Sequence, residues 1–299
     1  MPFISLEDLE LHYEHQSNGD TPIIFLHGNF GSWHYWQPFL QDLPSGYCGY
    51  APDFRGCGDS EVTDNGYDIK TLSQDVAQFA DRLKIDTFHL VGHSLGGAVA
   101  QELAGTIPER ILTLTLVAPA PAEGMASLTN VSVSDSFFSA KNIFQFLATI
   151  GLKRRFLSTT LKKTMPRLNN NKGYLNLVVN DALKMDIKAF DGFLMALKNW
   201  NGVHLLKRFD FPVLIMHGEL DSVIPLQPLK NMQQQIKDCR FHTFRNVGHS
   251  PQLEHTKAFN KLLRGFLHGH EIETISDNVF KKPLNIFSQL KLKLKGLFK

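Results

Sequence analysis

The chain has 299 residues, of which 43% are hydrophobic, and a formal net charge of +2 at pH 7. Such a chain can bury a large core, and its balanced charge excludes a general affinity for nucleic acid or other polyanions. Three cysteines without metal-like spacing argue against a disulfide framework and favour a reducing compartment. The first residues lack the basic start and long apolar region of a signal peptide, and no apolar stretch is long enough to span a bilayer. We therefore expect a cytoplasmic protein.

The predicted elements alternate between strand and helix after an antiparallel start. Residues 4–7 and 10–13 alternate in hydropathy like the arms of a hairpin. Further strands are expected at 23–26, 49–51, 88–91, 112–117, 213–216 and 241–244, and helices at 36–43, 71–83, 98–106, 226–237 and 257–267. This order predicts an α/β fold with a mostly parallel, eight-stranded sheet flanked by helices on both faces.

The alternation stops between residue 121 and about residue 208, where apolar residues recur at helical spacing. We expect a helical cap inserted at 122–208, which divides the core into 1–121 and 209–270. An insertion at this point would lie over the C-terminal edge of the sheet and exclude water from a site there. Residues 271–299 are expected to form a basic amphipathic tail, with six lysines and no acid between 281 and 299.

A candidate nucleophile lies between the strand at 88–91 and the helix at 98–106. Residues 92–97 read Gly-His-Ser-Leu-Gly-Gly, which is a G-x-S-x-G pattern in the strand–turn–helix setting that gives this pattern meaning. A tight turn of this kind requires small neighbours and lifts the hydroxyl of Ser94 above the sheet. The sequence therefore predicts a nucleophilic serine.

A serine alcohol needs a base, and the base needs an orienting acid. In this type of sheet the expected chain order is Ser, then Asp or Glu, then His. Asp221 follows the strand at 213–216, and His249 follows the strand at 241–244. We expect His249 to accept the Ser94 proton and Asp221 to orient its ring. His93 is the alternative base, and Glu219 and Glu123 are the alternative acids.

Acyl transfer also requires donors for a developing oxyanion. The backbone N–H of Leu95 is expected to be one donor, because it begins the nucleophile helix. The second donor is expected in the loop after the strand at 23–26, at Asn29, with Phe30 as the alternative. His27 is expected to brace this loop rather than to react.

Four segments together resemble the α/β-hydrolase fold family, in its single-domain, cap-bearing branch. They are His-Gly-Asn-Phe at 27–30, Asp-Phe-Arg-Gly-Cys-Gly-Asp-Ser at 53–60, the serine turn at 92–97, and the Asp221 and His249 turns. Their order and spacing match the family from about residue 3 to about residue 268. The resemblance implies a serine-type triad, while the segment at 53–60 supports the site without taking part in chemistry.

Departures from the patterns of some branches narrow the resemblance. Haloalkane dehalogenases and cap-bearing epoxide hydrolases have Asp where this chain has Ser94. Proline iminopeptidases carry an H-G-G-P-G loop, and hydrolases of carbon–carbon bonds in ring-cleavage products carry an H-G-x-G-P-G loop, whereas this chain has His-Gly-Asn-Phe-Gly at 27–31. The remaining branches are carboxylesterases, lactonases, acyl-carrier methyl esterases and cofactor-free haloperoxidase-like enzymes.

Aromatic and basic residues suggest how substrates and partners bind. Phe30, Phe138, Phe144 and Phe193 are candidates for an acyl pocket, although each cap phenylalanine could instead belong to the core of the cap. Trp33 and Trp36, beside the oxyanion loop, are expected to be packing residues. The basic cap and tail could bind an anionic carrier or a membrane surface, so a peripheral membrane location is an alternative; a charge run can also be a solvated face.

The sequence thus predicts a serine hydrolase that cleaves a carboxylic ester or related acyl compound through an acyl-enzyme, with no cofactor or metal. One alternative is an acyltransferase or perhydrolase that uses the same triad. Another is a hydrolase-fold binding protein without turnover.

Overall fold

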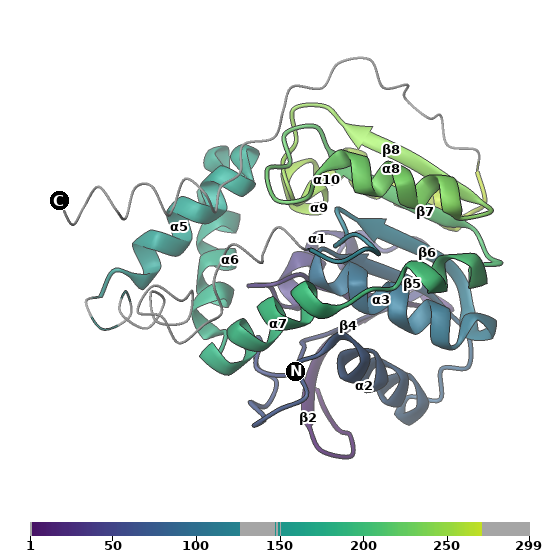
Figure 1. Ribbon diagram of the computed structural model, residues 1–299, viewed down its shortest axis with the longest axis horizontal. Helices are drawn as coiled ribbons and strands as arrows, with labels where there is room; N and C mark the ends of the chain where they lie inside the picture. Colours follow the sequence, from purple (N-terminus) through teal and green to yellow (C-terminus); the bar gives the residue numbers. More distant parts are fainter. Residues whose placement is uncertain (1, 126–146, 148, 150, 271–299) are drawn as a thin grey trace.

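The computed structural model describes residues 2–125, 147, 149 and 151–270 (Figure 1). One eight-stranded sheet runs through it in the order β1-β2-β4-β3-β5-β6-β7-β8. Pairing is antiparallel for β1–β2 and β2–β4 and parallel for all other neighbours, which confirms the predicted sheet. The strands are β1 (Phe3–Ser5), β2 (Glu10–Ser17), β3 (Gly19–Leu26), β4 (Gly46–Pro52), β5 (Phe88–His93), β6 (Ile111–Val117), β7 (Val213–Gly218) and β8 (Cys239–Phe244).

The central strands are buried on both faces, as the apolar runs in their sequences require. Every residue of β5 and of β7 is buried. Parallel strands covered by helices on both sides have this composition rather than strict alternation. Since β5, β7 and β8 are parallel members of one sheet, the loops that follow them open at the same edge. These loops carry the three residues predicted to react.

Helices cover both faces of the sheet (Figure 1). On one face, α2 (Ile69–Arg82) packs beside α3 (Leu95–Thr106), and α8 (Leu226–Gln235) follows β7. On the other face, η1 (Trp33–Tyr35), α1 (Gln37–Leu40), α9 (Pro251–Glu254) and α10 (Thr256–Leu267) pack together. The helix expected at 36–43 is shortened to α1, with the separate turn η1 just before it. Helix α3 begins three residues earlier than expected because Gly96 and Gly97 lie inside it.

In the described part of the insertion between β6 and β7, all the regular secondary structure is helical. It contains α5 (Lys153–Thr164), η4 (Pro166–Asn170), α6 (Lys172–Lys184), α7 (Ile187–Asn199) and η5 (Val203–Arg208). Figure 1 shows α5 and α6 beyond one edge of the sheet, with α7 leading back to the core. The boundaries 122–208 stay a prediction. The tail at 271–299, with its proposed membrane contact, lies outside the described residues.

Polar contacts join this insertion to the core. Lys184 and Lys188 form ion pairs with Asp59 and Asp64 at 2.6 and 2.7 Å. The buried carboxylate of Asp181 accepts a hydrogen bond of 2.9 Å from Ser32 Oγ, close behind the predicted oxyanion loop. Among the described helices, none is long and apolar enough to cross a bilayer.

Candidate active site

Ser94 occupies a sharp turn between β5 and α3. Its φ is 54° and its ψ is −115°, a backbone conformation that a side-chain-bearing residue rarely adopts. The turn is possible because glycines stand at 92, 96 and 97, two or three residues from Ser94. A Cβ on Gly92 would lie 2.4 Å from the carbonyl oxygen of Gly96, and one on Gly97 would lie 2.5 Å from Pro119 Cβ. The turn places the hydroxyl of Ser94 at the C-terminal edge of the sheet, beside the N-terminus of α3.

Three residues far apart in the sequence form one hydrogen-bonded series. The Oγ of Ser94 lies 3.0 Å from Nε2 of His249, and Nδ1 of His249 lies 2.8 Å from Oδ2 of Asp221. The other oxygen of Asp221 accepts the backbone N–H groups of Val223 and Ile224 at 2.8 and 3.0 Å. Since Nδ1–H donates to the carboxylate, Nε2 is left to accept the serine proton. This geometry is that of a general base held by an acid.

The electrostatics of Asp221 suit an orienting carboxylate. Burial by itself would raise the pKa of this carboxyl group. The charge of His249, its hydrogen bond and the neighbouring His217 and Ile224 N–H outweigh that effect, so the pKa of Asp221 is lowered. Asp221 is therefore ionised at neutral pH, which is the state that an orienting carboxylate for His249 requires.

The alternative base and acids lie outside this series. Nε2 of His93 lies 3.0 Å from the backbone carbonyl of His249, and burial lowers the pKa of His93 to about 3. His93 is thus a neutral support for the His249 loop. Glu219 accepts the backbone N–H of Asn246 at 2.9 Å, and Glu123 is exposed to solvent. Neither carboxylate is hydrogen-bonded to His249.

The two backbone amides predicted as oxyanion donors lie at the start of α3 and in the loop after β3. Within the described part of the chain, the N–H groups of Leu95 and Asn29 have no acceptor. The N–H of Phe30 donates to Asn29 Oδ1 at 3.0 Å, which makes Phe30 the weaker candidate. His27 braces the loop, since Nδ1 donates to the carbonyl of Gly28 at 2.8 Å and Nε2 accepts the N–H of Phe54 at 2.9 Å.

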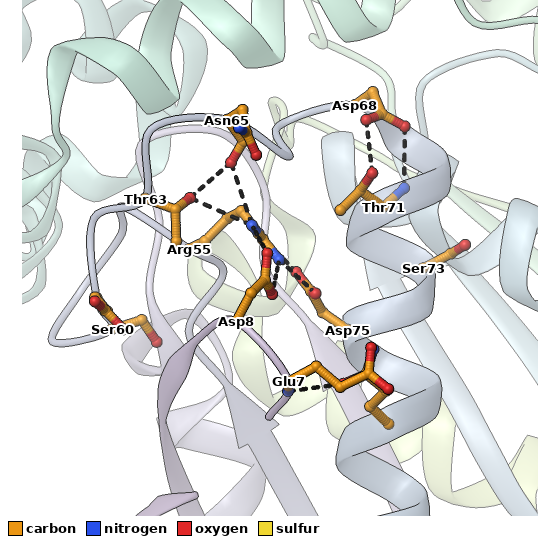
Figure 2. Close-up of polar contacts among 12 residues, drawn as sticks. Glu7, Asp8, Arg55, Ser60, Thr63, Asn65, Asp68, Thr71, Ser73 and Asp75 are labelled. Atoms are coloured by element: carbon orange, nitrogen blue, oxygen red, sulfur yellow. Dashed lines mark hydrogen bonds and ion pairs between the residues drawn. The ribbon is translucent and has the colours of Figure 1, made fainter. Parts of the chain in front are cut away.

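The segment at 53–60 packs against the loop that follows β3 and holds it through hydrogen bonds. The carboxylate of Asp53 accepts the backbone N–H of Trp33 at 2.7 Å and lies 2.7 Å from Nδ1 of His12. Arg55 is fully buried and binds Asp75 through two hydrogen bonds of 2.9 and 2.6 Å (Figure 2). These contacts give the segment a structural role, as the resemblance implies.

The predicted pocket residues divide into three groups. Phe30 is half-buried, and its ring centroid lies 5.2 Å from that of Phe190 on α7. Phe193 is wholly buried and packs edge-on against Phe54 and Tyr67, a setting that favours the alternative in which it belongs to the core; its place in the pocket stays a prediction. Phe138 and Phe144 lie outside the described residues. Trp33 and Trp36 are buried packing residues, as expected.

Sequence reasoning missed the contact between the base and the insertion. The backbone N–H of His249 donates to the carbonyl of Thr164, at the end of α5, at 2.8 Å. Glu254 also reaches both segments through backbone N–H groups. A backbone acceptor has no side-chain signature, whereas the acidic residue five positions after His249 was a signal that could have been used.

A model of the family described as the alpha/beta hydrolase fold matches residues 21–256, so the chain belongs to the α/β-hydrolase fold family. The 2-hydroxymuconate semialdehyde hydrolase of Pseudomonas sp. (strain CF600) is 25% identical over 271 residues, which are 88% of this chain and 92% of that protein. The dihydrolipoyllysine-residue acetyltransferase component of the acetoin cleaving system of Cupriavidus necator is 27% identical over 279 residues, or 89% of this chain and 69% of that protein.

Solved structures agree on the fold. The enol-lactonase from Burkholderia xenovorans LB400 has a TM-score of 0.77 at 20% identity and covers 89% of this chain and 100% of its own. The esterase from Exiguobacterium antarcticum has a TM-score of 0.74 at 21% identity, with 89% of this chain and 98% of its own covered. The chain is therefore a member of a hydrolase family, with an eight-stranded sheet and flanking helices of the family's type.

Proposed function

We propose that this protein is a serine hydrolase of carboxylic esters or related acyl compounds. The observation that carries the proposal is the series Ser94–His249–Asp221, with contacts of 3.0 and 2.8 Å. Another hydrogen-bonded set of serine, histidine and aspartate among the described residues, Ser32–His34–Asp181, differs because both partners contact the same ring nitrogen, Nδ1 of His34. The esterase and enol-lactonase names of the similar structures are consistent with this substrate class.

The proposed reaction has two halves. Ser94 Oγ bonds to the substrate carbonyl carbon while its proton moves to Nε2 of His249, and the N–H groups of Leu95 and Asn29 stabilise the oxyanion. The intermediate collapses, the bond to the alcohol breaks, and His249 returns the proton to the leaving oxygen. Water, deprotonated by His249, then attacks the acyl-enzyme and releases the acid and Ser94.

Hydrolysis of nitrophenyl esters from acetate to palmitate, by the wild type and Ser94→Ala, tests this proposal. We expect turnover by the wild type and a loss of several orders of magnitude in the variant. A fluorophosphonate probe reports the reactivity of Ser94 independently of the ester chosen. Residual turnover near that of the wild type would exclude Ser94 as nucleophile, and no turnover with no labelling would favour a binding protein. Product ratios with water, peroxide and alcohol separate hydrolysis from perhydrolysis and acyl transfer.

A second candidate reaction is hydrolysis of a carbon–carbon bond in a 2-hydroxy-6-oxo-dienoate. It is favoured by relatives such as the 2-hydroxy-6-oxo-6-phenylhexa-2,4-dienoate hydrolase of Burkholderia cepacia, which is 27% identical over 281 residues. The oxyanion loop of this chain, His-Gly-Asn-Phe-Gly at 27–31, still departs from the pattern of that branch. Loss of the dienoate absorbance on mixing with the enzyme would support this reaction over ester hydrolysis.

The insertion also carries the proposed site for an anionic partner. Residues 147–180 contain seven Lys or Arg and no Asp or Glu. Six of these cations are exposed: Arg154, Arg155, Lys162, Lys163, Arg167 and Lys172. Because Thr164 contacts His249, this basic face adjoins the site, and we propose that it attracts anionic or carrier-bound acyl substrates.

A further inference from the structure

Glu254 is a buried carboxylate beneath the loop of the proposed base. It is the last residue of α9, and 7% of its surface is exposed. Oε2 accepts the backbone N–H of Gly248 at 3.1 Å and that of Arg167 at 3.1 Å, and Oε1 accepts the N–H of Ser250 at 3.1 Å. Two of these donors flank His249, and the third belongs to η4 of the insertion.

The backbone amide of His249 lies between those of Gly248 and Ser250 and is hydrogen-bonded to the insertion. The N–H of His249 donates to the carbonyl of Thr164 at 2.8 Å. The chain of the insertion lies directly against the loop here, since a Cβ on Gly248 would be 2.3 Å from Thr164 O and 2.6 Å from Pro166 Cδ. Three consecutive amides, from Gly248 to Ser250, are therefore fixed, two by Glu254 and one by the insertion.

We propose that Glu254 is a positioning residue that aligns His249 with Ser94. This alignment also depends on the packing of segment 164–167 against the His249 loop. The inference rests on the proposed role of Ser94 and His249. A carboxylate suits this position because it only accepts hydrogen bonds and has sites for several donors. No lysine or arginine side chain of the described residues forms an ion pair with Glu254, so its partners are backbone amides.

Retaining this carboxylate has an energetic cost. Burial raises the pKa of Glu254 to about 7, although the amides of Ser250, Arg167 and Gly248 and the nearby His249 act in the opposite direction. A residue needed only to fill space at this point could be neutral. The structure instead places an acceptor where three N–H groups converge. Loss of this acceptor would leave the amides of Gly248 and Ser250, on either side of His249, without their partner.

The substitution Glu254→Gln tests the inference because it keeps the shape and replaces one acceptor oxygen by a donor. We expect kcat for a nitrophenyl ester and the rate of fluorophosphonate labelling to fall roughly 10- to 100-fold, since small misplacements of a reacting group have effects of this size. KM should change less than kcat. The proton NMR signal of His249 Nδ1–H, assigned by its loss in Asp221→Asn, should broaden or disappear. Glu109→Gln, at an exposed position, is the matched control.

Each outcome decides the inference. Wild-type kcat with an unchanged imidazole signal in a folded Glu254→Gln protein would overturn it, as would a change in KM alone. If that variant does not fold, Glu254→Asp keeps the charge but withdraws it by one methylene, and unchanged kcat and signal there would also overturn the inference. If the wild type neither hydrolyses esters nor reacts with the probe, the proposed function fails, while the imidazole signal still reports whether Glu254 positions His249.

Discussion

Gly96 lies directly against the backbone of His27: a Cβ on Gly96 would be 2.4 Å from the carbonyl oxygen of His27 and 2.5 Å from that of Leu26. The helix that follows the nucleophile thus touches the strand end that begins the oxyanion loop. A backbone oxygen of a sheet can move only together with its strand. The added methyl group of Gly96→Ala must therefore push α3 away from the end of β3. We expect a loss of about 1–3 kcal/mol in the free energy of unfolding, and a fall in kcat as Asn29 moves away from Leu95. Denaturant unfolding and ester kinetics measure both.

Gly173→Ala is the control for Gly96→Ala. Gly173 lies in α6, is exposed, and has only Asn171 Oδ1 near the position of an added Cβ, at 3.6 Å. An alanine there should leave activity unchanged and the stability equal or slightly higher, because alanine favours helix. Equal effects of the two substitutions would show that the contact between Gly96 and His27 is not tight.

Asp221→Asn should lower kcat by about 10⁴-fold while the protein stays folded, because an amide no longer selects the Nδ1–H tautomer of His249 or stabilises its charged form. The ester assay and circular dichroism provide the measurement. Glu219→Gln serves as comparison, since Glu219 binds the amide of Asn246 and not His249. A similar loss in Glu219→Gln would reassign the orienting acid.

Arg55→Met should destabilise the fold by about 3–5 kcal/mol, because the carboxylate of Asp75 would remain buried without its cation. Figure 2 shows Arg55 between Asp75, Asp8 and Asn65. Its hydrogen bonds go to these residues and to Thr63, and not to the reacting groups. Activity per folded molecule should therefore persist at low temperature. Urea unfolding of Arg55→Met, and of Arg55→Met with Asp75→Asn, measures how much of the loss comes from the stranded charge.

The exposed pair Lys237–Asp210 supplies the control for this prediction. Its two side chains are 82% and 77% exposed, so Lys237→Met should change stability by less than about 0.5 kcal/mol. A small effect at Arg55 as well would mean that water or a shift of α2 compensates Asp75.

The pattern of the nucleophile turn could be predicted from sequence because its constraints are local. Gly92 and Gly96 are four residues apart and contact each other, so a short motif records the geometry. The sequence predicts the start of α3 too late for a related reason. Gly96 and Gly97 are typical of turns, yet both lie inside the helix, where Gly96 packs against Leu26 and His27 and Gly97 packs against Pro119. Local propensity is easily outweighed by such contacts.

Contacts between distant segments could not be predicted in the same way. The hydrogen bond from His249 N–H to Thr164 O depends on where α5 ends above the sheet, and the acceptor is a backbone atom common to every residue. The place of Phe193 in an apolar insertion fits either a pocket or the core, and only the structure shows that its ring contacts Phe54 and Tyr67. Hydrophobic spacing shows that a side chain is buried and does not show against which partner.

Acid should destabilise the protein between about pH 6.5 and pH 4. Burial lowers the pKa of His89 to about 4, and it lowers the pKa of His27, His93 and His217 as well. The unfolded state then binds protons that the folded state does not, so stability present above pH 6.5 is lost as the pH falls. Glu254 acts in the opposite direction, because its pKa is raised to about 7, but we expect the effect of the buried histidines to be larger.

Urea unfolding at pH 7, 6 and 5 measures this dependence. His89→Gln should reduce the slope of the unfolding free energy against pH by up to about 1.4 kcal/mol per pH unit, the contribution of one proton. His15→Gln, at an exposed position, should leave the slope unchanged. Stability that is constant or rises from pH 7 to pH 5 would contradict the prediction.

Reversal of charge on the insertion should affect anionic substrates selectively. Lys162 and Lys163 are exposed at the end of α5, and Thr164 next to them binds the His249 loop. The double substitution Lys162→Glu and Lys163→Glu should lower kcat/KM for a nitrophenyl hemisuccinate several-fold at low salt, because steering of the anion is lost. The effect should shrink as salt screens the charges, and kcat/KM for nitrophenyl acetate should stay within about twofold. Equal losses for the two esters would show that these lysines support the structure of the insertion instead of attracting anions.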